Sequence, residues 1–162
     1  MKDILKRIRE GIELNRSMIK QYAFLGLKGY KKAHEFFYQE DNERYLDLLD
    51  FYVSNYKEIP EEEAIPIVEV KAEDKKELKE YIANSLSAYI LFCKESSDLY
   101  KKKYDELLEL GEMASACKLY DIICDTEYHL KVAEIHTANA KMMQYDKLWI
   151  LYEQERLYNK YN

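Results

Sequence analysis

The chain has 162 residues and a formal net charge of −6, and apolar residues make up 48% and charged residues 35% of it. This balance argues against a disordered chain and against a membrane protein, and the negative charge argues against a general nucleic-acid binder, which needs a basic face. Four Gly and two Pro are too few for the turns of an all-β chain of this length, so long helices are expected.

Three breaks divide the chain, at Gly26–Gly29, Pro60–Pro66 and Gly111. Between them apolar residues recur every three or four positions, which predicts helices at about 2–25, 30–57, 74–109, 112–143 and 146–160. Asp146 is the expected N-cap of the last helix.

The lengths of the connections predict how these helices pack. Short connections join the first helix to the second and the third to the fourth, and a long one with a β-like run at 65–70 joins the second to the third. Helices joined by short loops pack antiparallel. We therefore expect one all-α domain over residues 1–162, an antiparallel four-helix bundle (about 2–143) with one long crossover and a short C-terminal fifth helix, and helical repeats are the rival architecture.

The periodicity also predicts which residues face the core. Asn15 falls in the middle of the apolar stripe of the first helix, and Leu46 joins the inner side of the second. The fourth helix carries an apolar stripe at Met113, Cys117, Tyr120, Ile123 and Cys124. A flanking stripe follows Ile122, Thr126, His129, Ala133, His136 and Ala140. The three Cys are expected to be reduced and packed, and His34 to be exposed.

Two stretches carry a family resemblance. Residues 111–136, GEMASACKLYDIICDTEYHLKVAEIH, resemble the last bundle helix of bacterioferritins and rubrerythrins, where a Gly-Asp turn and a Leu-rich turn precede Asp-Glu-Glu-x-His. Residues 34–53 are similar to the ferritin segment that carries Glu-x-x-His. The resemblance implies a ferritin-like fold. It also implies a di-iron centre with one Glu on each of two helices and Glu-x-x-His on each of the other two.

Matched position by position, the resemblance implies that this centre is degenerate. Glu43 and His129 match a carboxylate and a His of the family. The other four positions depart from it: Asn15, Leu46, Cys93 and Thr126. Glu10 and Glu13 are alternatives to Asn15 in the first helix.

Two functional hypotheses follow. The first is a ferritin-like protein without the usual di-iron ferroxidase centre or a catalytic residue, which acts by self-assembly or by binding a protein partner. The alternative is an iron-binding or iron-oxidising protein, a di-metal oxidoreductase, whose rearranged site uses Glu43 and His129 with Glu95 or Glu127 and Cys93 to hold iron or another divalent metal.

The expected setting is cytoplasmic. The first residues, MKDILKRIREGIE, alternate charged with apolar residues, and no apolar run approaches the length of a membrane span. Tyr residues near the end of the chain, such as Tyr152, Tyr158 and Tyr161, exceed what one core needs, so a homo-oligomer is expected. The acidic run Glu61–Glu63 is either a cation-binding feature of an assembly or a solvated loop.

Overall fold

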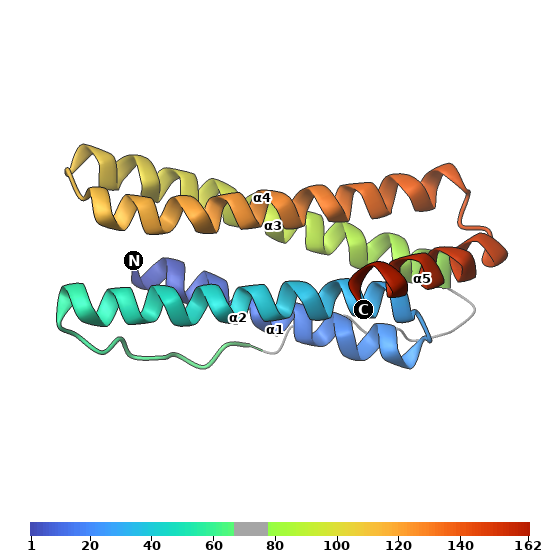
Figure 1. The fold of residues 1–162 in the computed structure, drawn as a ribbon. Helices are drawn as coiled ribbons and strands as arrows, with labels where there is room; N and C mark the ends of the chain where they lie inside the picture. Colours follow the sequence, from blue (N-terminus) through green and yellow to red (C-terminus); the bar gives the residue numbers. More distant parts are fainter. Residues whose placement is uncertain (67–77) are drawn as a thin grey trace.

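The structure, a computed structural model, describes residues 1–66 and 78–162 (Figure 1). Its helices are α1 (Lys2–Phe24), α2 (Lys28–Tyr56), α3 (Leu78–Glu109), α4 (Met113–Met142) and α5 (Lys147–Tyr161). The predicted all-α fold is confirmed, and the described residues include no strand. Of the predicted β-like run, residues 65 and 66 have no regular structure and the rest lies outside the described residues.

α1 and α2 form one antiparallel hairpin and α3 and α4 form another, and the two hairpins pack into the bundle (Figure 1). Each tight connection depends on a glycine with positive φ, 72° at Gly26 and 73° at Gly111. The nitrogen of Leu27 donates to the carbonyl of Tyr22 (2.9 Å), which is the closing hydrogen bond of a Schellman motif. Gly26 and Gly111 therefore end α1 and α3 as the sequence predicted, whereas Gly29 lies inside α2.

The bundle has two apolar cores, one toward each end. The first includes Tyr22, Phe37 and Tyr89, and the second includes Leu48 and Leu119. Between them, each of the four long helices carries polar residues at the level of Asn15. No helix within the described residues has the length and hydropathy that a membrane span needs.

α5 packs against the beginning of α2, and Gly29 makes this contact possible (Figure 1). A Cβ at Gly29 would lie 2.6 Å from the backbone oxygen of Gln154 and 2.8 Å from the Cβ of Leu157. The side chain of Gln154 accepts a hydrogen bond from the backbone nitrogen of Tyr30 (2.9 Å). This bond satisfies one of the free N–H groups in the first turn of α2 and attaches α5 there. Asp146 caps α5 as predicted, since it accepts from the nitrogen of Trp149 (3.1 Å).

Ile123 and His129 of α4 are buried as expected, but the predicted packing of Cys117 and Cys124 was wrong. The core face of α4 is the flanking stripe, where His129 and His136 are buried, whereas Cys117, Tyr120 and Cys124 are exposed. Both faces of this helix are apolar, so its periodicity alone could not choose between them.

We predict that Gly29→Ala loosens α5, because the added methyl group would overlap backbone atoms that cannot rotate away. The expected loss in the free energy of unfolding is about 1–3 kcal/mol, the usual cost of overpacking. Urea unfolding would measure it, and hydrogen exchange should quicken in α5 and not in the α3–α4 turn. Unchanged exchange in α5 would contradict the prediction.

Candidate functional site

The candidate site is the polar layer between the two apolar cores. Asn15 of α1 is completely buried and joins two side chains of α2. Its Nδ2 donates to Asp41 Oδ2 (3.0 Å) and to the carbonyl of Gly11 (3.2 Å), and its Oδ1 accepts from Nδ1 of His34 (2.8 Å). His34 is 1% exposed, so its predicted exposure was wrong.

His129 of α4 extends this network to the far side of the bundle. Its Nε2 donates to Oε2 of Glu40 at 2.5 Å, and its Nδ1 lies 3.8 Å from Oδ1 of Asp41. The ring also packs on Phe37, with centroids 4.5 Å apart. The imidazole is therefore held between two neighbouring carboxylates of α2.

A cavity of about 20 Å³ lies beside these groups and is bounded by all four long helices. A space of this size holds about one water molecule. Asp41, Cys93, Thr126 and His129 line it, and so do two guanidinium side chains, Arg7 and Arg44.

Both arginines are fixed by other polar groups. Arg7 Nε donates to Ser96 Oγ (2.8 Å), and its guanidinium carbon lies 3.9 Å from the centroid of the Phe92 ring. Arg44 Nε donates to Oδ2 of Asp125 on α4. A guanidinium keeps its charge at all ordinary pH values, so the layer contains two permanent cations, and each is paired with a carboxylate: Arg7 with Glu10 (3.1 Å) and Arg44 with Asp125.

Burial changes the ionisation of the acidic groups in this layer. Burial raises the pKa of Asp41 to about 6, although His129 and the hydrogen bond from Asn15 act in the opposite direction. Burial also raises the pKa of the Cys93 thiol to about 12, so this residue stays protonated at neutral pH. Burial lowers the pKa of His34 well below its usual value, and His34 therefore stays neutral.

The structure brings four of the six matched residues together. Asn15 is in the layer, as preferred over Glu10 and Glu13, and the cavity is lined by the other three: Cys93, Thr126 and His129. The other two matched residues lie elsewhere, since Glu43 is exposed and accepts from Gln39 (3.3 Å), and Leu46 is 62% exposed. The expected inward position of Leu46 was wrong.

The acidic residues offered for a rearranged site are engaged in other contacts. Glu95 is exposed, and its carboxylate lies 3.5 Å from Arg7. Glu127 pairs with Lys101 (2.6 Å) and accepts from Ser97 (2.5 Å).

Sequence reasoning missed the pair on α2 that does line the cavity, Asp41 and Arg44. They are three residues apart, like the Glu and His of the motif, but two positions before Glu43 and Leu46. A signal existed, because Asp41 is four residues after buried Phe37 and seven before buried Leu48. These spacings place it on one helix face with them.

Comparison with solved structures identifies this architecture. The chain is similar to an open pore ferritin from the hyperthermophilic archaeon Archaeoglobus fulgidus, with a TM-score of 0.78 and 14% sequence identity over 96% of this chain and 92% of that one. The chain has the ferritin-like fold. A form of the Archaeoglobus fulgidus ferritin engineered to be closed matches it equally well, with a TM-score of 0.78 and 13% identity over 98% and 94% of the two chains. No family model and no curated protein matches the sequence.

The polar layer of this ferritin-like chain does not fit a pair of metal ions. Among residues 1–66 and 78–162, no three His, Cys, Asp or Glu side chains are grouped so that they could hold a metal. The donor set is also poor, because the carboxylate of Glu40 is bound to His129, and Asn15, Cys93 and Thr126 stand in place of the three Glu that the resemblance implies. The charges of Arg7 and Arg44 would repel a cation in the cavity that they line.

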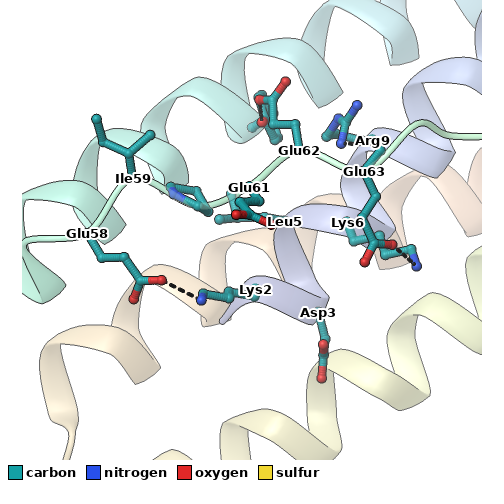
Figure 2. Close-up of a pocket in the computed structure, with 12 residues that line it drawn as sticks. Lys2, Asp3, Leu5, Lys6, Arg9, Glu58, Ile59, Glu61, Glu62 and Glu63 are labelled. Carbon is teal, nitrogen blue, oxygen red and sulfur yellow. Dashed lines mark hydrogen bonds and ion pairs between the residues drawn. The ribbon is translucent and has the colours of Figure 1, made fainter.

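A second candidate is a hollow of about 520 Å³ between the first half of α1 and the strap, which we define as residues 57–66 after α2 (Figure 2). Lys2 pairs with Glu58 (2.5 Å) and Lys6 with Glu63 (2.9 Å). Lys6 lowers the pKa of Glu63 below its usual value. The acidic strap is thus partly neutralised by basic side chains of α1, which lessens its suitability for binding cations.

We predict that the strap is held to α1 by these ion pairs. In a Lys2→Ala/Lys6→Ala variant, amide hydrogen exchange at residues 58–63 should quicken, because two tethers from α1 are lost, although Arg9 still donates to the carbonyl of Glu63 (2.8 Å). About 1 M salt should act in the same direction on the wild type, since its screening length of about 3 Å is comparable with the separation of these exposed charges. Lys20→Ala, the same change in the other half of α1, is the control and should leave exchange in the strap unchanged.

We predict that acid weakens the fold through buried histidines. Burial lowers the pKa of His136 to about 4, so its contribution to stability is present above its unfolded value of 6.5 and is lost as the pH falls toward 4. Asp41 acts oppositely, because its raised pKa adds stability that is lost as the pH rises through about 6.

The test is urea unfolding of wild type and His136→Gln between about pH 7.5 and about pH 5. The variant should lose about 1–2 kcal/mol less free energy of unfolding than the wild type over this range. Equal losses in the two proteins would refute the assignment to His136.

Proposed function

We propose that this chain is a ferritin-like bundle that does not oxidise or store iron between its helices. It acts through self-assembly or through binding a protein partner, and not as an enzyme. One observation supports this most directly: the guanidinium groups of Arg7 and Arg44 line the central cavity beside Asp41 and His129. Fixed positive charge occupies the layer in which the family resemblance calls for a metal pair.

The proposal explains why a layer of polar residues persists without a metal. An unpaired buried carboxylate would be costly, but Asp41 accepts from Asn15 and lies beside His129 and the two arginines. The buried acid is thus held by an amide and an imidazole of the protein itself, although burial still raises its pKa.

Iron loading tests the proposal. Wild-type protein incubated with ferrous iron in air, then desalted, should retain well under one iron per chain and should not accelerate oxygen consumption. Two irons per chain, the content of a di-iron centre, with rapid oxygen uptake would overturn the proposal.

A variant in which the missing ligands are restored serves as the positive control for the iron assay. Asn15→Glu, Arg44→His, Cys93→Glu and Thr126→Glu together would give a Glu on α1 and on α3 and an acid-x-x-His pair on α2 and on α4. This variant should gain iron if circular dichroism shows that it is folded. Where it does not fold, the wild-type measurement decides alone.

The alternative function, a rearranged metal site on Glu43 and His129, makes a different prediction. Under that hypothesis the wild type takes up metal and a Glu43→Ala/His129→Ala variant does not. Metal uptake that is equal in the two proteins would count against the rearranged site.

A further inference from the structure

The first half of α4 has an apolar face that the described helices leave largely exposed, although the ring of Tyr120 lies 6.1 Å from that of Tyr104 on α3. Met113, Tyr120 and Tyr128 are 58%, 54% and 48% exposed, and Cys117 and Cys124 are exposed between them. Steps of three or four residues keep all five on one side of a helix with 3.6 residues per turn. All but Tyr128 belong to the apolar stripe that the sequence predicts for this helix.

The same face continues to the end of the helix. Ile135 is 48% and Met142 73% exposed, and Lys131 and Ala138 are exposed in the same spacing. Met113 to Met142 therefore form one straight apolar stripe, which we call the outer face of α4, and Lys131 is its one charged member. A helix that is apolar on both faces is usually covered on both, so this face is suited to a partner.

The spacing of the outer face matches its own reverse at every position but Tyr128, whose counterpart is Glu127. A two-fold axis between positions 127 and 128 that sets two copies of α4 antiparallel would bring Met113 opposite the partner's Met142. Tyr120 would then lie opposite the partner's Ile135. A two-fold interface must be complementary to itself, and eight of the nine positions of this stripe pair with one another about the axis.

The charge at the centre of the outer face fits the same pairing. Lys131 would lie opposite the partner's Cys124 and within about one turn of the partner's Asp121, an exposed carboxylate. By symmetry this attraction would occur twice. Cys117 would lie opposite the partner's Ala138, where small side chains allow close approach of the helices.

We propose that the outer face of α4 is a homodimer interface in which two copies of the helix pack antiparallel about this axis. The occupant of the face is a second copy of this chain. The inference rests on the self-assembly part of the proposed function and names its surface. It is independent of the iron measurement, so either proposal can fail while the other stands.

Mass in solution tests the interface. Under reducing conditions, sedimentation equilibrium at up to about 100 µM should give at least twice the chain mass. Tyr120→Glu/Ile135→Glu should weaken the dimer more than about 100-fold, because it places four carboxylates in the interface, and should retain the wild-type circular dichroism. The control is Leu91→Glu, which changes a leucine of α3 that is 57% exposed and lines a hollow with α1, and it should leave the mass unchanged.

Cross-linking tests the register. In a Cys124→Ser/Ala138→Cys variant, mild oxidation should link Cys117 of one chain to the introduced thiol of the other. The wild type should not link Cys117 to Cys124 of its partner, because in this register these positions are separated by about 21 Å along the helices. A monomeric wild type, a mass unaffected by the two Glu substitutions, or a dominant Cys117–Cys124 link would each overturn the proposal.

Discussion

The hydrogen bond between Asn15 and Asp41 is the constraint on which the middle of the bundle depends. Both groups lie between two apolar cores, where an unpaired amide or carboxylate would cost far more than the bond contributes. α1 and α2 cannot slide along each other without breaking it. His34 and His129 add further polar contacts to this pair. A few polar contacts therefore fix how the helices are aligned with one another along the bundle axis.

The residues of this layer also differ from those that the family resemblance leads one to expect at the centre of the fold. The architecture is that of solved ferritins over nearly the whole chain, yet Asp41 and His129 at its centre have an amide, a protonated thiol and two arginines as neighbours in place of further metal ligands. Helix packing depends on the apolar cores on either side, and a metal site depends on a few side chains between them. The first can therefore persist while the second changes.

Packing uses the apolar faces of this chain selectively. α5 covers the beginning of α2 because Gly29 lets its backbone come close. α4 contributes one apolar face to the core and leaves the opposite one on the surface. A chain with more apolar helix surface than its own core can cover is suited to assembly, which connects the fold to the function that we propose.

The sequence by itself determined the helices, their ends and the single long crossover, because glycines, prolines and apolar spacing act locally. It also placed Asn15, Cys93 and His129 toward the core. Only the tertiary structure decided that Asp41 and Arg44, not Glu43 and Leu46, face the cavity, and which face of α4 is buried. Each of these outcomes depends on how one helix is rotated about its axis relative to its neighbours. The contacts that favour one rotation join segments far apart in the sequence, so the periodicity within a single helix does not reveal it.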